Sequence, residues 1–221
     1  VVYKTVVAKS DINLGDFEWT AMTQSDPEAI ITNRELEVNT WAQIVADAKA
    51  RGDRRLELEV IEENIPAINL YEQSGFQKVR KLASYSLENP TGVTARLEEI
   101  DLRTMGRLIF LHGYQDFPWQ MSGESLLQMS LPNRAFRYMD SAVAISSPAA
   151  EQIFIRALLL NIENKTQIQT LLQGLFALYP GKTWKVPAIF PEEFCGTFEQ
   201  AGFERGSLAQ FQMALRLSAQ P

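Results

Sequence analysis

Tyr71 and Asn64 are the two residues of this chain whose side chains best suit proton donation and hydrogen bonding to a ligand. The phenol of Tyr71 carries a proton that it can donate, and the amide of Asn64 can both donate and accept hydrogen bonds. Three carboxylates, those of Glu59, Glu62 and Glu63, lie shortly before them and are candidates to accept a proton. This short segment therefore combines a proton donor, an amide and candidate general bases.

A strand, a short helix and a second strand are expected to position these side chains. Apolar and polar residues alternate over residues 56–61 and again over residues 78–85, which predicts two strands. Between them, Asn64 precedes Pro66 and an apolar run that ends at Gly75, which predicts a helix closed by a glycine. The polar side chains then lie at the strand–helix junction and on the helix itself.

The segment Asn64-Ile-Pro-Ala-Ile-Asn-Leu-Tyr71-Glu-Gln-Ser-Gly75-Phe76 resembles the C-terminal half of the GCN5-related N-acetyltransferase (GNAT) superfamily. In that family a strand ends near Asn and is followed by Ala, by Leu-Tyr and by Gly-Phe. The family uses this unit to hold acetyl-coenzyme A. The resemblance covers roughly residues 36–87.

This resemblance implies a cofactor and a set of site residues. Acetyl-CoA is the implied cosubstrate, and Tyr71 is the implied catalytic residue, which protonates the departing coenzyme A thiolate. The pantetheine arm is expected to enter between splayed strands at 56–61 and 78–85 and to pair with their backbone, as a peptide adds to a sheet edge. The implied cofactor-binding residues are Leu58, Glu59, Val60, Asn64, Ala67 and Tyr71.

The chain contains an internal repeat. Glu72-Gln-Ser-Gly75-Phe76 recurs 127 residues later as Glu199-Gln-Ala-Gly202-Phe203. The surrounding patterns recur as well, with helices predicted over 40–52 and 167–181, strands over 56–61 and 184–190, and final strands over 78–85 and 208–217. Two copies of one α/β unit explain this better than chance.

The expected fold class is α/β (α+β), with two GNAT-like domains that each hold a mixed central sheet flanked by helices. The turn cluster Glu88–Gly92 is the expected boundary, which gives domains over residues 1–88 and 92–219. The first domain is abridged or partly missing. From Val1 to Phe76 there are 75 residue steps, against 111 from Gly92 to Phe203, so the first copy is shorter by about 36.

A glycine-rich loop is the strongest GNAT signature, and neither copy has it. In the family this loop opens the central helix, where backbone N–H groups and the helix dipole hold the coenzyme A pyrophosphate. Asn33–Glu37 precedes the first predicted helix and contains no glycine, and Asn161–Thr166 precedes the second and contains none.

The two copies also differ in their chemistry. Asn64 aligns with Pro191, which has no donor, and Tyr71 aligns with Phe198, which has no hydroxyl. The resemblance therefore implies a catalytic first domain and a degenerate second one.

Each candidate residue also has a structural interpretation. Tyr71 can serve packing alone, and Asn64 can serve as the N-cap of the helix that begins near Pro66. Glu62 and Glu63 can be solvated charges at a helix start, so the general base stays open among the three glutamates. The basic stretch Lys49–Arg55 is either a solvated helix end or a contact to an anionic cofactor.

Composition excludes several classes of function. The net charge of −6 and a pI near 5.0 argue against general affinity for nucleic acid or an anionic membrane, and no run approaches the ~18 apolar residues of a membrane span. His112 is the single histidine, so a site built on a histidine pair is excluded and no metal is expected. The single cysteine, Cys195, forms no internal disulfide and fits a cytoplasmic location.

The leading hypothesis is acetyl-CoA-dependent N-acetylation of a small-molecule amine or a protein N-terminus. The alternative is a catalytically silent GNAT-like module that binds an acyl-CoA or a partner protein. A homodimer is compatible with either, since the second domain could provide a dimer surface.

Overall fold

The computed structural model describes residues 41–50, 52–113, 117–160 and 165–217. The chain divides into two compact units. Unit 1 comprises Val1–Val79 together with Gln212–Pro221, and unit 2 comprises Arg80–Phe211. The first unit therefore takes residues from both ends of the chain.

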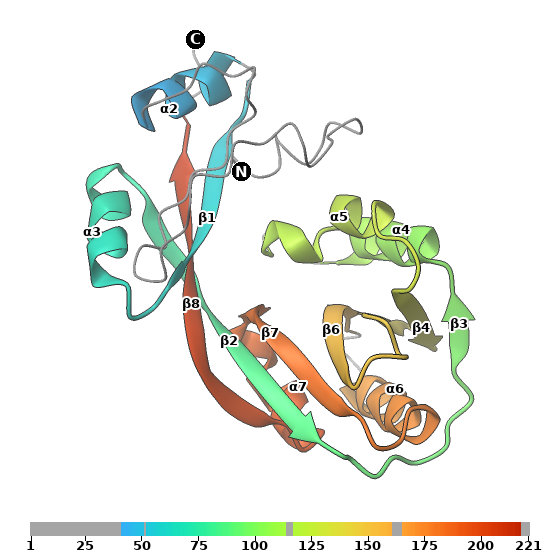
Figure 1. Cartoon of the computed structure of the whole chain (residues 1–221). Helices are drawn as coiled ribbons and strands as arrows, with labels where there is room; N and C mark the ends of the chain where they lie inside the picture. The colour runs from blue at the N-terminus through green and yellow to red at the C-terminus, as the bar shows by residue number, and fades with distance from the viewer. Residues whose placement is uncertain (1–40, 51, 114–116, 161–164, 218–221) are drawn as a thin grey trace. The chain divides into compact units, whose positions relative to one another are not determined.

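The described residues of unit 1 form a helix, a strand, a second helix and parts of two long strands (Figure 1). In chain order these are α2 (Trp41–Ala50), β1 (Arg55–Ile61), α3 (Ile65–Gln73), the start of β2 (Gln77–Glu88) and the end of β8 (Glu204–Arg216). The predicted strand–helix–strand order over residues 56–85 is confirmed.

Unit 2 holds the rest of β2 and β8 and the elements between them. These are β3 (Glu98–Ile100), α4 (Leu102–His112), η2 (Trp119–Met121), α5 (Gly123–Leu127), β4 (Arg134–Tyr138), β5 (Ser141–Ile145), β6 (Gln152–Leu159), α6 (Lys165–Leu178), β7 (Thr183–Pro191), η3 (Glu192–Phe194) and α7 (Cys195–Gln200). The second set of predicted elements, a helix and two strands after residue 167, is confirmed as α6, β7 and β8.

The strands of unit 2 form a mixed sheet in the order β8-β2-β7-β6-β5-β4-β3. Neighbours from β3 to β6 are antiparallel, β6 and β7 are parallel, and β2 and β7 are antiparallel. The parallel pair is connected through α6, as a parallel crossover requires.

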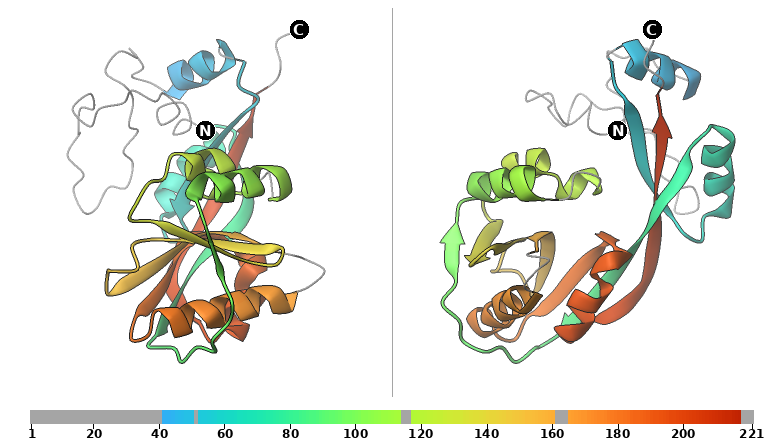
Figure 2. Two further views of the ribbon diagram at one scale, coloured as in Figure 1. Left: turned by 90° about the vertical axis from the view of Figure 1, so that its right-hand side faces the viewer. Right: turned by 180° about the vertical axis from the view of Figure 1, so that it is seen from behind.

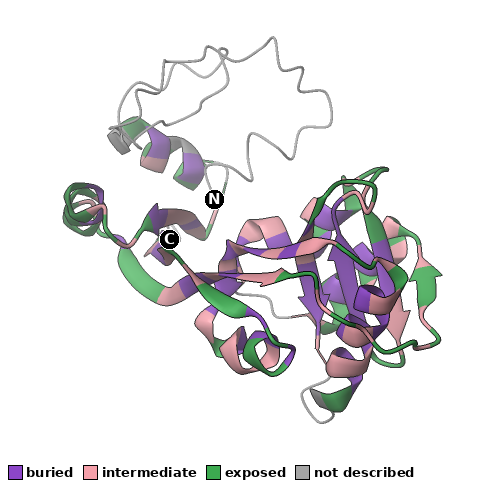
Figure 3. Ribbon diagram, turned by 60° about the horizontal axis from the view of Figure 1, so that its bottom comes forward, coloured by how far each residue is buried: buried purple, intermediate pink, exposed green. Residues whose placement is uncertain are grey.

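Helices cover both faces of this sheet, with α4 and α5 on one side and α6 on the other (Figure 2, left). β5 shows why the sheet needs two covers, because all five of its residues are buried. Val143 and Ile145 pack in the cluster that contains α6, while Ala142 and Ala144 pack in the cluster that contains α4 and α5. The buried residues of the central strands stand out in Figure 3. A mixed sheet flanked by helices is therefore confirmed, but the strands of both predicted domains belong to one sheet and not to two.

In unit 1 the strand order is β1-β8-β2. The backbone N–H of Leu217 donates to the carbonyl of Arg54 at 2.9 Å, next to the β1–β8 pair. The prediction that a pantetheine arm enters between strands 56–61 and 78–85 is wrong, because β8 occupies the place between β1 and β2. The sequence order of the two strands does not show that the last strand of the chain pairs between them.

None of the helices in the described part of the chain is long and apolar enough to cross a membrane. The predicted domain limits at 1–88 and 92–219 concern sequence copies, whereas the compact units divide the chain at 79/80 and 211/212. The difference arises because β2 and β8 are long enough to contribute to both units.

The segment that follows β2 lies against α6. The N–H of Val93 donates to the carbonyl of Gln173 at 3.2 Å, and a Cβ on Gly92 would lie 2.1 Å from the backbone nitrogen of Ala177. Gly92 is therefore required by the close approach of two backbones.

Replacing Gly92 with alanine should lower the free energy of unfolding by about 1–3 kcal/mol, the usual cost of overpacking. Gly196 is the matched control, since a Cβ there would meet no atom within 4 Å and the residue lies in α7. Gly196→Ala should leave stability unchanged or raise it by up to about 1 kcal/mol. Urea unfolding of both variants tests this, and equal effects would contradict the close approach.

Candidate functional site

Asn64 connects β1 to α3 as a helix N-cap. Its Oδ1 accepts a hydrogen bond from the backbone N–H of Ala67 at 3.2 Å, and Pro66 lies in the first turn of α3. The capping role predicted for Asn64 is confirmed, and it fixes the direction in which α3 leaves β1. The Nδ2 group makes no hydrogen bond to any residue that the structure describes, so it can still donate to a ligand.

Tyr71 lies on α3 and is half-buried. Its ring packs against that of Phe76 with centroids 6.0 Å apart and an interplanar angle of 57°. The packing role is therefore confirmed. The catalytic role of Tyr71 stays a prediction.

The remaining predicted cofactor residues lie on β1 and at the start of α3. Leu58 and Glu59 are half-buried, Val60 is 6% exposed and Ala67 is 1% exposed. In unit 1, β8 lies beside one edge of β1, and no strand of the described residues lies beside the other. The backbone of residues 58–60 can therefore pair along that second edge. The backbone N–H of Ala67 is already taken by Asn64, so a contact from Ala67 must use other atoms.

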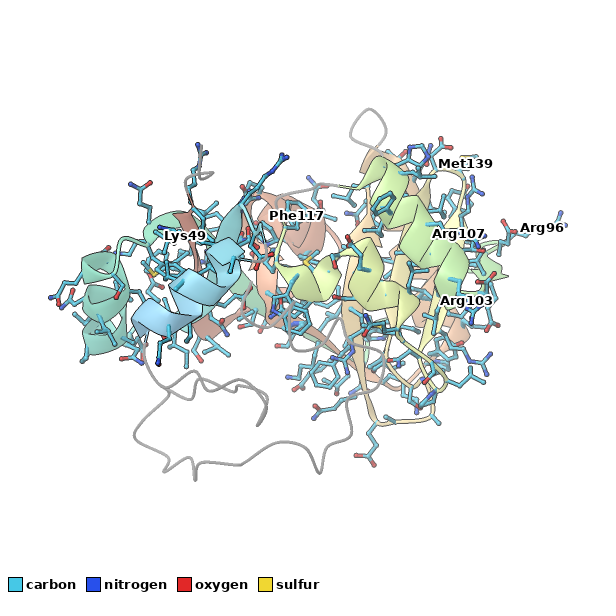
Figure 4. All side chains as sticks on the ribbon, turned by 90° about the horizontal axis from the view of Figure 1, so that it is seen from above. Lys49, Arg96, Arg103, Arg107, Phe117 and Met139 are labelled. Carbon is cyan, nitrogen blue, oxygen red and sulfur yellow. The ribbon has the colours of Figure 1, made fainter. Side chains whose placement is uncertain are left out.

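The basic stretch at the end of α2 favours the structural interpretation. Lys49 lies exposed in the last turn of α2 (Figure 4), where a cation complements the helix dipole. Arg55 forms an ion pair with Glu57 at 2.5 Å, so it does not offer an unpaired charge to a cofactor.

The second copy reproduces the backbone of the first. In α3 the N–H of Phe76 donates to the carbonyl of Tyr71 at 2.9 Å, and in α7 the N–H of Phe203 donates to that of Phe198 at 3.0 Å. The rings correspond as well, since Phe198 and Phe203 lie 5.5 Å apart at 69°. The two segments thus share hydrogen bonds and ring packing but not the hydroxyl.

The glycines that close the two helices also correspond. Gly75 has φ +91° and Gly202 has φ +92°, a left-handed conformation that glycine adopts without strain. A Cβ on Gly75 would lie 3.2 Å from a methyl of Leu215 on β8, and one on Gly202 would lie 3.8 Å from a methyl of Leu87 on β2. Each helix end is therefore packed against the final strand of the other copy.

The segment around Pro191 and Phe198 lacks the amide and the phenol that Asn64 and Tyr71 provide in the other segment. Pro191 stands at the N-cap of η3 and makes no side-chain cap. Phe198 is fully buried, and its ring lies 5.1 Å from that of Tyr85 on β2. Burial raises the pKa of Tyr85 to about 12, and its hydroxyl makes no hydrogen bond to the described residues. This buried hydroxyl beside α7 was not predicted, because β2 belongs to the other copy in sequence.

Two strands of the second copy separate along their length. β6 and β7 pair in parallel over Gln152–Phe154 and Thr183–Lys185. Both strands continue beyond these pairs, β6 to Leu159 and β7 to Pro191. A splayed parallel pair was predicted, and the structure has one here rather than between β1 and β2.

The two isolated reactive residues have ordinary positions. His112 is the last residue of α4 and is exposed. Cys195 begins α7 and is half-buried.

Solved structures provide the clearest comparison. A GCN5-related N-acetyltransferase from Sphaerobacter thermophilus superposes with a TM-score of 0.55 at 13% identity, over 81% of this chain and 65% of that one. A GCN5-related N-acetyltransferase from Kribbella flavida gives 0.54 at 12%, over 85% and 50%. Eis1 from Mycobacterium abscessus gives 0.54 at 12%, over 79% and 50%. No protein-family model and no curated protein sequence matches the chain.

The chain has the GNAT fold. It spans between half and two-thirds of the length of these three structures. At 12–13% identity the likeness concerns the fold, so the activity must be argued from the side chains of this chain.

The cap at Asn64 can be tested separately from any role in binding. Asn64→Ala should lower the free energy of unfolding by about 1 kcal/mol, because the N–H of Ala67 loses its acceptor. Asn64→Asp keeps an acceptor and should be close to neutral.

Asn69 is the matched control for this substitution, because it is exposed on the same helix. Asn69→Ala should be neutral or slightly stabilising, since alanine is the better helix former. Chemical unfolding measures the free energy of unfolding of the three variants. An equal loss in Asn69→Ala and Asn64→Ala would contradict the capping role of Asn64.

Proposed function

We propose that the chain is the acyl-transfer part of an acetyl-CoA-dependent N-acetyltransferase built from two GNAT-like copies, over residues 1–88 and 92–219. The first copy carries the chemistry, and the second is degenerate. One observation supports this most directly. The β1–α3 and β7–α7 segments share backbone hydrogen bonds and glycine conformations, yet only the first keeps an amide and a phenol, on Asn64 and Tyr71.

The edge of β1 that faces away from β8, beside which the structure describes no strand, is the proposed binding site for the pantetheine arm. Backbone groups of Leu58, Glu59 and Val60 along this edge can pair with the amides of the arm, as in strand addition. Nδ2 of Asn64, at the end of the same strand, is a further donor. Ala67, in the first turn of α3 and 1% exposed, is the remaining proposed contact of the arm.

The proposed reaction is direct transfer of the acetyl group. The neutral amine of the acceptor attacks the thioester carbonyl, and a carbon–nitrogen bond replaces the carbon–sulfur bond. The attacking amine gives its proton to a general base or to water. Tyr71 gives its phenolic proton to the departing thiolate. Glu59 is half-buried on β1, while Glu62 and Glu63 precede α3, and the base stays open among these three and water.

The acceptor belongs to the same proposal. A small-molecule amine and a protein N-terminus both fit the chemistry, with no role for nucleic acid or a membrane. A cytoplasmic protein, alone or as a homodimer, is consistent with it. The parts of related chains that this one does not span can contribute to acceptor choice.

A second candidate function is an acyl-CoA-binding module without turnover. It is favoured by the absence of glycine from Asn33–Glu37 and from Asn161–Thr166, the segments that precede α2 and α6. Without a phosphate-binding loop, binding would depend on the pantetheine arm and not on the pyrophosphate.

Acetyl-CoA should raise the melting temperature of the protein, because a ligand of the native state stabilises it by mass action. At a concentration 100 times the dissociation constant the stabilisation is about 2.7 kcal/mol. S-Acetyl-pantetheine, which lacks the pyrophosphate and nucleotide, is the comparison ligand. Thermal unfolding with each ligand measures the effect, and absence of any shift with acetyl-CoA would remove both candidate functions.

Tyr71→Phe should reduce kcat by about 100-fold or more, the usual contribution of a positioned acid, with little change in the dissociation constant for acetyl-CoA. Tyr138, a half-buried tyrosine on β4, is the matched control, and Tyr138→Phe should leave both constants unchanged. Thiol release in the presence of a panel of amines measures turnover. Binding without turnover by the unmodified protein would favour the silent module, and full activity of Tyr71→Phe would limit Tyr71 to packing.

A further inference from the structure

Unit 2 contains a cavity of about 340 Å³ that no part of the proposed reaction uses. The residues around it come from α6, β3, β4 and the connecting segment 89–97, whose course Figure 1 shows. Its lining residues are Thr94, Ala95, Leu97, Glu99, Phe136, Gly174, Ala177 and Leu178. None of them belongs to the β1–α3 segment, so the cavity can be tested independently of the acetyl-transfer proposal.

Small residues on α6 and on the connecting segment create this space. Gly174 allows the segment to approach, since a Cβ there would lie 3.0 Å from Ala95 and 3.0 Å from Leu97. Ala177 lies one turn further along α6 and carries only a methyl group where a larger side chain would fill the cavity. The cavity is therefore defined by the residue types on α6.

The floor of the cavity is apolar. Phe136 is 3% exposed and packs in the main core of unit 2, with Leu97 against the same cluster. Leu178 is 51% exposed, which is high for a leucine on a packed helix. An apolar ligand would cover the side chain of Leu178, and the burial of this apolar surface would contribute favourable binding free energy.

Glu99 is the one charged side chain among the lining residues. Its Oε1 pairs with Arg134 at 2.5 Å, and both side chains are nearly half exposed. Exposed ion pairs of this kind contribute little, about 0–1 kcal/mol. A carboxylate has two oxygens, so Glu99 can bind a second cation through Oε2 without loss of Arg134.

Tyr179 lies next to the lining residues and is not one of them. Its ring packs edge-on against Phe136, with centroids 6.1 Å apart, and so holds that side of the cavity in place. Burial raises the pKa of the Tyr179 hydroxyl, and the charge of Glu99 raises it further.

We propose that this cavity binds a small amphiphilic primary amine. The alkyl or aromatic part lies among Leu97, Phe136 and Leu178, and the ammonium group lies against the carboxylate of Glu99. The volume is near the lower end of the ~300–1,000 Å³ typical of small-molecule sites, so the ligand is small. A carboxylate ligand is disfavoured, because Glu99 lines the cavity and Arg134 is not among its lining residues.

Three probes of equal length test the proposal on the full chain: hexylamine, hexanol and hexanoate. Each is titrated into ¹⁵N-labelled protein and followed by amide chemical shifts. Hexylamine should bind most tightly, ahead of hexanol by about three- to fivefold, the value of one exposed ion pair. Shifts should centre on residues 94–99 and 174–178. Tighter binding of hexanoate, shifts elsewhere, or no binding of hexylamine would overturn the proposal.

Paired variants test the carboxylate of Glu99 and the volume of the cavity separately. Glu99→Gln should abolish the preference for hexylamine over hexanol, whereas Glu98→Gln, the same change on the neighbouring residue of β3, should preserve it. Ala177→Leu should weaken all three probes together because it fills the cavity. Unfolding curves confirm that each variant is folded. Equal effects of Glu98→Gln and Glu99→Gln would overturn the assignment of Glu99.

Discussion

Strand pairing between distant parts of the chain is the constraint on which this structure depends. In unit 1, β8 lies between β1 and β2, and in unit 2, β2 lies between β8 and β7. The final strand of the first repeated segment, β2, therefore pairs with β7 of the second segment. The final strand of the second segment, β8, pairs with β1 of the first. Side chains follow the same exchange, because Leu215 of β8 packs on Gly75 and Leu87 of β2 packs on Gly202. Such non-local pairing forms only after long loops close.

The two repeated segments share a backbone conformation but carry different side chains. Asn64 satisfies the first turn of α3, while Pro191 starts η3 without a side-chain cap. Tyr71 is half-buried, whereas its counterpart Phe198 is enclosed by Tyr85 and other rings. The segment around Phe198 thus has apolar packing where the segment around Tyr71 has hydrogen-bonding groups.

Local patterns predicted the elements well. Alternation over 56–61 and 78–85, the cap at Asn64 and the closing Gly75 all follow from interactions within a few residues. The pairing of β8 between β1 and β2 could not be predicted in this way, because backbone hydrogen bonds carry little sequence information. The cavity beside α6 was also missed, since it results from small residues that meet only in the folded chain.

Unit 1 includes Gln212–Pro221 as well as Val1–Val79. A chain shortened before β8 would therefore lack the strand that pairs with both β1 and β2, so the segment that bears Tyr71 depends on residues translated last.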